Sequence, residues 1–198
     1  MPNLEQIKSF LADHQPVTIE KASKQAAVAL ILSGAENDLE MLMLRRAEHQ
    51  DDPWSGDLGF PGGKIDPDDH SARAAAERET IEETGIRLNE TDYLGRLDDI
   101  SGAYLPVSIA CFVFYLPTRP QIVLNREVSH YWWVPLHRFL EPDRHRDVAF
   151  TYRQQHRTHP VIDLVDPEHP FLWGITYRLT ESFFRLIERP LPVENRSE

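Results

Sequence analysis

Three carboxylates are spaced so that they fall on one face of a helix. Glu79, Glu82 and Glu83 stand at positions i, i+3 and i+4, which are neighbours on a helix of 3.6 residues per turn. Like charges this close repel each other, and a divalent cation is the usual remedy. Mg²⁺ takes oxygen ligands and is commonly shared between one or two carboxylates and a substrate phosphate. A solvated acidic helix face is the alternative, because such charge patterns are common on exposed helices.

A glycine-rich turn followed by a helix must position these glutamates. The turn is Phe60-Pro61-Gly62-Gly63, and the helix is expected to begin between Asp68 and Ser71. It should end at Gly85, because glycine suits a left-handed cap. The loop is therefore expected to lie against the carboxylates.

Small and apolar side chains divide the rest of this helix into two sides. Small residues toward the glutamates would let another backbone segment approach closely, and the other side would pack on a sheet. The first set is Ala72, Ala75 and Ala76, and the second is Ala74 and Ile81.

The same stretch resembles the Nudix box. Gly63, Arg78-Glu79, Glu82-Glu83 and Gly85-Ile86 stand in the order of that motif. Three departures are that Asp69 stands for the first Glu of the box, one extra residue precedes Arg78, and Thr80 replaces an apolar residue. The extra residue and the Gly-Gly-Lys-x-Asp-Pro-x-Asp opening resemble the branch of the family that contains the coenzyme A pyrophosphatases.

This resemblance implies a site for Mg²⁺ or Mn²⁺. Glu79 and Glu83 would ligate the metal directly, Glu82 directly or through water, and the carbonyl of Gly63 would complete the site. A metal ion lowers the pKa of a bound water and others neutralise phosphate oxygens, so a pyrophosphate bond can be cut by in-line displacement.

The resemblance also implies supporting carboxylates and a cation. Arg78 would steady the carboxylates through an i,i+4 pair with Glu82, and Asp69 would be a helix cap or an outer group rather than a ligand. A Glu-Val pair before a strand that ends in Val-Pro-Leu resembles a further Nudix stretch. Its Glu127 is either a general base or a structural anion that pairs with Arg126 or His130.

Candidate substrate contacts flank the box. Arg45 and Arg46 would hold phosphate or be solvated, and Lys64 follows the glycine pair. Trp54 would stack on a base or cap the core. Tyr104 would contact a base or pantetheine, or anchor its loop.

The stretch before the box bears on the substrate. The coenzyme A pyrophosphatases typically carry a His and a Gln in this stretch, where this chain has Trp54 and Asp57. The resemblance therefore points to the reaction more directly than to the substrate.

The composition indicates one globular domain. With 198 residues, of which 41% are hydrophobic and 27% charged, the chain can form a sizeable core, and we expect a single Nudix hydrolase domain over residues 1–198. The formal net charge of −11 disfavours a nucleic-acid partner, because duplex binding depends on basic surface. An anionic substrate must then meet metal ions and local arginines.

Cysteine usage and hydropathy indicate the compartment. Cys111 is the only cysteine and lies in an apolar run, where a buried inert thiol or a nucleophile is expected. The chain has neither a leader pattern nor an apolar run that approaches a membrane span, so we expect a cytoplasmic protein without a membrane partner. The expected partner is a small nucleotide-diphosphate substrate, and a homodimer stays open.

Apolar runs predict the strands of a sheet. They occupy residues 26–32, 39–46, 93–99 and 106–116, and the first two are expected to form a hairpin. The last run is continuously apolar, which indicates burial on both faces. Helices must then cover both faces in an α/β fold, and the resemblance implies a Nudix-type α/β/α sandwich with a mixed β-sheet.

The remaining segments have weaker patterns. We expect helices over residues 4–14, within an N-terminal extension 1–20, and over 171–187, two strands around a basic turn over 149–164, and a flexible tail over 190–198. Four residues are expected at the surface: His137, Arg138, His145 and Arg146.

The sequence thus predicts a metal-dependent pyrophosphohydrolase that cuts a nucleoside diphosphate linked to another moiety. Coenzyme A or an acyl derivative is the leading substrate. ADP-ribose, a dinucleotide or a nucleotide sugar is the close alternative, and a non-catalytic nucleotide sensor on the same fold is the second.

Overall fold

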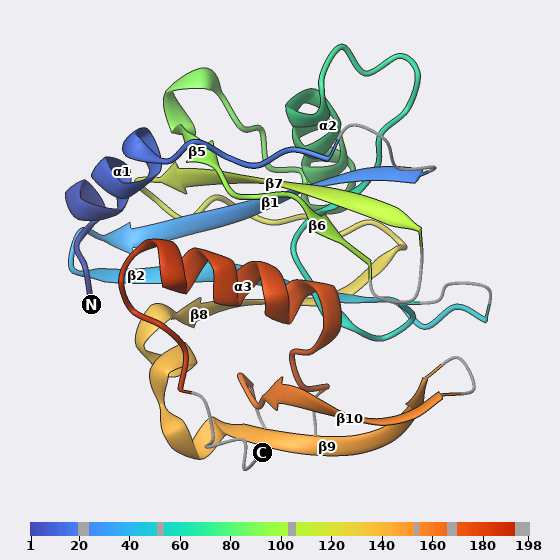
Figure 1. Cartoon of the computed structure of the whole chain (residues 1–198). Helices are drawn as coiled ribbons and strands as arrows, with labels where there is room; N and C mark the ends of the chain where they lie inside the picture. The colour runs from blue at the N-terminus through green and yellow to red at the C-terminus, as the bar shows by residue number, and fades with distance from the viewer. Residues whose placement is uncertain (20–23, 51–53, 103–105, 153–154, 166–169, 193–198) are drawn as a thin grey trace.

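A mixed sheet with a parallel central pair organises the molecule (Figure 1). The computed structural model describes residues 1–19, 24–50, 54–102, 106–152, 155–165 and 170–192. β1 (Lys24–Ala35) pairs parallel with β7 (Val107–Leu116), and the order across the sheet is β3-β2-β1-β7-β5. The other strands pair antiparallel: β2 (Asp38–Arg46), β3 (Leu58–Gly59), β4 (Gly62–Lys64), β5 (Tyr93–Arg96), β6 (Ile100–Ser101) and β8 (Val128–Pro135).

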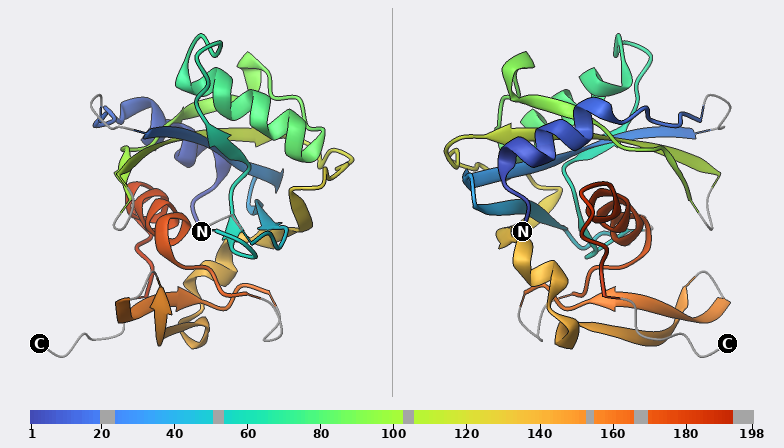
Figure 2. Two further views of the ribbon diagram at one scale, coloured as in Figure 1. Left: turned by 90° about the vertical axis from the view of Figure 1, so that its right-hand side faces the viewer. Right: turned by 60° about the vertical axis from the view of Figure 1, so that its left-hand side comes forward.

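Helices cover both faces of this sheet. α1 (Leu4–Asp13) and α3 (Gly174–Leu186) share a core with Leu30, and α2 (Ala72–Thr84) packs on the opposite face, in a core with Ala29. Figure 2 shows α2 and α3 on opposite sides of the sheet. Successive β1 side chains point to opposite faces, so one strand contributes to both cores. The expected α/β fold with a mixed sheet is confirmed.

Within the part of the chain that the structure describes, short 3₁₀ helices fill three connections: η1 (Glu90–Asp92), η2 (Leu136–Leu140) and η3 (Pro142–Arg144). None of the helices in the described ranges is both long and apolar enough to cross a membrane.

The predicted strand runs are confirmed with small shifts in their ends. β1 and β2 form the expected antiparallel hairpin. All but one residue of β7 is buried, as its continuous apolar sequence predicts. Cys111 lies within this strand, is fully buried, and has its pKa raised by that burial to about 12. Of the two alternatives for Cys111, its burial and raised pKa agree with the buried, inert thiol.

β2 and β4 pair with different parts of β1. β2 pairs with the end of β1 at Leu32 to Ala35, while β4 pairs with its beginning at Ala26 to Val28. β4 therefore lies beside the central strand at the point where α2 crosses it. This placement brings the glycine-rich turn to the helix that carries the glutamates.

α2 begins and ends where the sequence predicts, but it presents a different side to the sheet. The Ser71 hydroxyl accepts the Ala74 N–H at 3.1 Å, and Gly85 forms the left-handed cap at φ 73°. Ala74 and Ile81 are only half-buried, so the prediction that they form the sheet side is wrong. The buried residues are Ala75, Ala76, Thr80, Glu83 and Thr84.

Threonine can occupy this sheet side because its hydroxyl is satisfied within the helix. The Thr80 hydroxyl donates to the Ala76 carbonyl at 2.7 Å, and the Thr84 hydroxyl donates to the Thr80 carbonyl at 2.6 Å. A buried hydroxyl with a partner costs little. Thr80 is fully buried and so fills the apolar position of the box.

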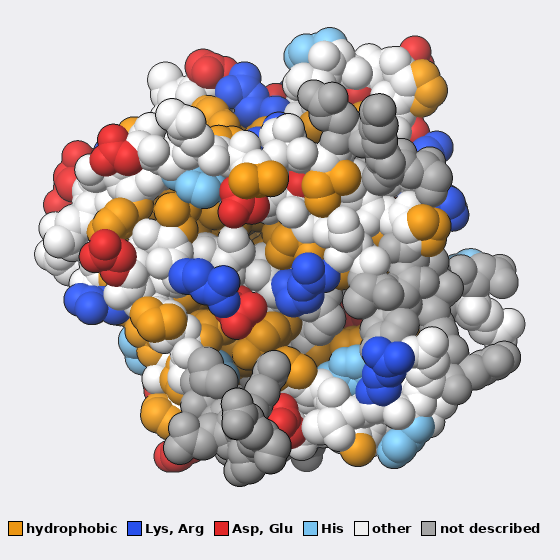
Figure 3. Space-filling view, viewed as in Figure 1, with side chains coloured by type: hydrophobic (Ala, Val, Ile, Leu, Met, Phe, Trp, Pro, Cys, Tyr) orange, Lys and Arg blue, Asp and Glu red, His pale blue; other side chains and the backbone are white. Residues whose placement is uncertain are grey.

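The C-terminal third forms a hairpin outside the main sheet. β9 (His145–Tyr152) and β10 (Gln155–Ile162) make a separate two-stranded sheet beside α3, which confirms the two strands predicted there. Figure 3 shows Lys/Arg and His side chains over this hairpin, whereas positive and negative side chains alternate over α3. His145 is buried and its Nε2 lies 2.8 Å from the Phe139 carbonyl, so its predicted surface position is wrong.

Both ends of the described chain contribute to the core. α1 buries Leu4, Ile7 and Leu11 in the core and is closed by a capping box at Asn3. Leu191 is also buried in this core, so the chain is still packed at a position where a frayed tail was predicted. Residues 193–198 lie outside the described ranges.

Candidate active site

Two glycines let the β4 backbone pass between β1 and α2. A Cβ on Gly62, whose φ is +149°, would lie 2.3 Å from the Ala27 carbonyl oxygen. A Cβ on Gly63 would lie 2.5 Å from the carboxyl carbon of Glu79. At Gly62 a side chain would collide with the β1 backbone, so only glycine fits, whereas at Gly63 a side chain would displace the Glu79 carboxylate. The glycine pair therefore brings the backbone directly against the glutamates of α2.

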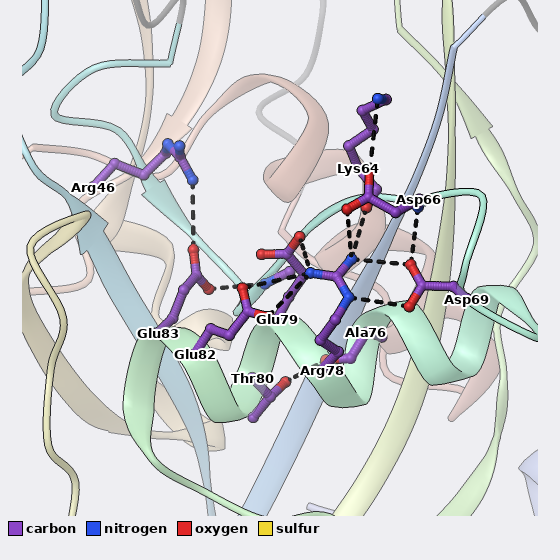
Figure 4. A network of polar contacts seen from close by, with 11 residues as sticks. Arg46, Lys64, Asp66, Asp69, Ala76, Arg78, Glu79, Thr80, Glu82 and Glu83 are labelled. Carbon is purple, nitrogen blue, oxygen red and sulfur yellow. Dashed lines mark hydrogen bonds and ion pairs between the residues drawn. The ribbon is translucent and has the colours of Figure 1, made fainter.

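Glu83 is the buried carboxylate of the site. Its side chain is 4% exposed, the Gly62 N–H donates to its Oε2 at 2.9 Å, and Arg46 Nη1 lies 3.6 Å from its Oε1 (Figure 4). Burial raises the pKa of Glu83 to about 7, although the Gly62 N–H and Arg46 favour the charged form. The negative charges of Glu79 and Glu127 contribute to the rise.

The three glutamates differ in exposure along the turn. The Glu79 side chain is 16% exposed and that of Glu82 is 54% exposed. Burial raises the pKa of Glu79, while its hydrogen bond from Arg78 works in the opposite direction. The site therefore presents one buried, one half-buried and one solvated carboxylate.

Arg78 connects the carboxylates of α2 to Asp69 and to the β4 backbone. Its Nε and Nη2 donate to Asp69 at 3.0 and 2.9 Å, and its Nη1 donates to Glu79 at 2.9 Å. The expected i,i+4 pair with Glu82 is present at 3.4 Å, and Nη2 also donates to the Lys64 carbonyl at 3.1 Å. One guanidinium thus joins α2 to β4 and to the loop between them.

Asp69 serves Arg78 and does not cap the helix. The hydrogen bond from Arg78 lowers the pKa of the Asp69 carboxyl, and the Asp66 N–H donates to the same carboxylate at 2.9 Å. Ser71 occupies the cap position. Of the two expectations for Asp69, the geometry agrees with the outer group.

The carboxylate of Glu127 is close enough to influence the charges of the site. Glu127 is exposed, and its charge contributes to the raised pKa of both Glu79 and Glu83. Its backbone is fixed because the Ala47 N–H donates to its carbonyl at 2.8 Å and its own N–H donates to Asn125 Oδ1 at 2.8 Å. In the described part of the chain no cation forms an ion pair with Glu127 within 4.0 Å, neither Arg126 nor His130.

Comparison with known proteins identifies the family. The NUDIX domain model matches residues 23–154, which is more than half of the chain. The chain belongs to the Nudix family. The uncharacterised Nudix hydrolase NudL of Yersinia pestis (strain Pestoides F) is 30% identical over 158 residues, covering 78% of this chain and 76% of that protein. NudL of Yersinia pseudotuberculosis serotype O:1b matches to the same extent.

A solved Nudix structure shares the fold. The MutT/nudix family protein from Enterococcus faecalis superposes with a TM-score of 0.59 at 15% identity, covering 93% of this chain and 70% of that chain. The family part of the resemblance is thus confirmed, and membership supports the prediction of a pyrophosphatase enzyme.

The oxygen donors of this Nudix site suit a hard divalent cation. In the described ranges, no three acidic, His or Cys side chains converge into a preassembled metal cage. Mg²⁺ does not need one, because it keeps several waters and binds through one or two carboxylates and substrate phosphates. Glu83 is buried with a raised pKa, and a cation would relieve that cost. The residues fit Mg²⁺ or Mn²⁺.

The predicted phosphate-binding cations lie at different distances from the glutamates. Arg46 reaches Glu83, whereas Arg45 lies 3.3 Å from Glu48. The Lys64 ammonium is largely exposed and lies 3.6 Å from Asp66. Arg46 is therefore the predicted phosphate contact that the structure brings to the carboxylates.

Of the two residues predicted to contact a base, Trp54 and Tyr104, only Trp54 lies within the described residues. Trp54 is half-buried, and its carbonyl accepts the Asp57 N–H at 3.1 Å. Tyr104 lies outside the described residues. Asp57, at the position of the coenzyme A branch Gln, accepts the Trp173 Nε1–H at 2.9 Å.

Sequence reasoning missed the part that Trp173 plays. In the sequence, Trp173 is one residue of the segment 171–187, for which only a helix is predicted. Its contact with Asp57 spans 116 residues of sequence, so no local pattern could indicate it.

Proposed function

We propose that this chain is a Mg²⁺- or Mn²⁺-dependent pyrophosphohydrolase that cuts the diphosphate of a nucleoside diphosphate linked to another moiety. The observation that carries the proposal is the contact of β4 with α2, where the Gly62 N–H meets buried Glu83 at 2.9 Å and Gly63 adjoins Glu79. A buried carboxylate beside another is costly without a cation. A purely structural protein would not need this buried pair of carboxylates.

In this proposal Glu79 and Glu83 hold the metal with the Gly63 carbonyl, and Glu82 binds directly or through water. When bound, the ion lowers the pKa of a water and neutralises phosphate oxygens. Arg78 keeps Glu79 and Glu82 in place, and Arg46 meets the substrate phosphate. Glu127, which is exposed and lacks an ion pair in the described ranges, is our candidate to accept the proton of the attacking water.

Coenzyme A or an acyl derivative is the leading substrate, because the Gly-Gly-Lys-x-Asp-Pro-x-Asp opening of the box and its extra residue resemble that branch. ADP-ribose, a dinucleotide or a nucleotide sugar is the alternative. It is favoured by one observation: Asp57, where the coenzyme A branch has Gln, is engaged by Trp173. The sensor hypothesis predicts loss of one or more box glutamates or a fused pair of DNA-binding helices. Glu79, Glu82 and Glu83 are all present, although Asp69 stands for the first Glu of the box.

A panel of diphosphate-linked compounds tests the proposal. Incubation with Mg²⁺ and with Mn²⁺ should give cleavage at the P–O–P bridge of one or a few compounds. Glu83→Gln should lower the rate on the order of 10³-fold or more, because it removes a metal-binding charge.

Glu77→Gln is the matched control. Glu77 lies on the same helix but pairs with Arg73 at 3.3 Å, so the rate should stay close to that of the wild type. Cleavage of none of the compounds would contradict the reaction. Cleavage of coenzyme A no faster than ADP-ribose would contradict only the coenzyme A assignment.

A further inference from the structure

Trp173 lies where α3 meets the β9–β10 hairpin. It immediately precedes α3, and its carbonyl accepts the Tyr177 N–H at 3.2 Å. Its ring packs edge-on against Phe150 and Tyr152 of β9, with ring centroids 4.8 and 5.0 Å apart. His159 of β10 lies 5.4 Å from it on the same measure. Aromatic pairs at these distances are favourable beyond their buried area, so the indole is anchored in the hairpin.

The indole N–H connects this anchor to the loop before β3. It donates to Oδ1 of Asp57 at 2.9 Å. The same stretch approaches α3 again at Gly59, where a Cβ would lie 3.8 Å from the Thr176 hydroxyl. A hydrogen bond to a carboxylate is stronger than one between neutral groups. The bond therefore fixes the loop to the start of α3.

Asp57 in turn fixes the backbone of Arg46. The Arg46 N–H donates to the Asp57 carbonyl at 3.0 Å, and Arg45 and Leu58 are paired in the β2–β3 register. The Arg46 guanidinium lies 3.6 Å from Glu83. A continuous series of contacts thus runs from the hairpin to the buried carboxylate.

We propose that Trp173 is a positioning residue that sets Arg46 for the substrate diphosphate through Asp57. This rests on the proposed function, because it takes Arg46 as a phosphate contact. Trp173 touches no reacting atom. Loosening its bond should weaken substrate binding more than it slows turnover, because Arg78 holds Glu79 and Glu82 and the Gly62 N–H holds Glu83 without any contact to Trp173.

Three variants test the coupling. Trp173→Phe removes the N–H donor and keeps an aromatic ring to pack against β9. Asp57→Ala removes the acceptor, and Asp57→Asn keeps an oxygen acceptor in its place. The readouts are KM and kcat for the compound that the wild type cleaves, and NMR hydrogen exchange of the Arg46 amide, which needs no turnover. The Ala29 amide, which donates to the Pro61 carbonyl at 2.8 Å, is the internal control.

Trp173→Phe and Asp57→Ala should each raise KM about tenfold, as expected for loss of a hydrogen bond to a charged group, and change kcat by less than about threefold. Exchange at the Arg46 amide should become about tenfold faster while exchange at Ala29 stays unchanged. Asp57→Asn should stay within about threefold of the wild type on both measures.

Two results would overturn the proposal. One is a Trp173→Phe enzyme with wild-type KM and wild-type exchange at Arg46. The other is exchange that accelerates equally at Arg46 and Ala29, because that would make Trp173 a residue of general stability. If the wild type cleaves no diphosphate, the proposed function fails by itself, and local loss of protection at Arg46 still decides whether the coupling exists.

Discussion

Glu83 combines burial with contacts that favour its charged form. The Gly62 N–H and Arg46 stabilise the carboxylate, yet burial outweighs them and raises its pKa to about 7. The folded protein without metal therefore holds a proton on Glu83 over a pH range in which the unfolded chain has lost it.

This pKa predicts a pH dependence of stability. Between the unfolded value of 4.5 and the folded value of about 7, the native state binds more protons, so the free energy of unfolding should fall as the pH rises. The contribution of Glu83 is on the order of 3 kcal/mol. Urea unfolding from pH 4.5 to 8 without metal measures it, and Glu83→Gln should remove most of this slope.

Mg²⁺ should counteract this fall in the free energy of unfolding as the pH rises. It binds the ionised carboxylate, so it should stabilise the wild type more at pH 8 than at pH 5 and stabilise Glu83→Gln little at either pH. Equal slopes for the wild type and Glu83→Gln would show that Glu83 is not the group that titrates.

α2 is the element that makes the site, and two of its contacts separate stability from positioning. The Ser71 hydroxyl caps the helix at 3.1 Å from the Ala74 nitrogen, whereas Asp69 orients Arg78. The two residues are close in sequence but act on different properties of the molecule.

Asp69→Asn should lower kcat about tenfold or more, because it removes the charge that pairs with Arg78. It should lower the free energy of unfolding by less than Ser71→Ala does. Ser71→Ala should cost about 1 kcal/mol of stability and leave kcat unchanged. Kinetics and urea unfolding of both variants measure this. Identical behaviour of the two variants would contradict the separate roles.

Much of α2 could be predicted from the sequence because its signals are local. A capping serine, a left-handed glycine and the i, i+3, i+4 spacing each depend on neighbouring residues. The side that faces the sheet could not, because it depends on how β4 and β1 crowd the helix. Buried Thr80 in place of half-buried Ile81 is the result.

At the scale of the whole molecule, hydrophobic runs predicted the sheet, since burial on two faces leaves continuous apolar sequence in β7. Long-range polar contacts were not predictable. The sequence predicts that the glycine turn lies against the glutamates, but the hydrogen bond from Gly62 to Glu83, like that from Trp173 to Asp57, depends on the relative placement of two elements. His145 was misplaced for the same reason, because its partner is a carbonyl on η2.

Cys111 provides a probe of the whole sheet. It is fully buried, with its pKa raised to about 12, so a thiol reagent at pH 8 should react with the native protein only as fast as the sheet opens. The thiol should react rapidly in urea. Stoichiometric labelling of the native protein within seconds would contradict its burial.

The most direct test of the central claim is a crystal structure with Mn²⁺ and a non-hydrolysable diphosphate analogue. We expect anomalous density for an ion about 2.0–2.3 Å from carboxylate oxygens of Glu79 and Glu83, with the Gly63 carbonyl among its ligands. Carboxylates that face only solvent, with no ion between α2 and β4, would contradict the account.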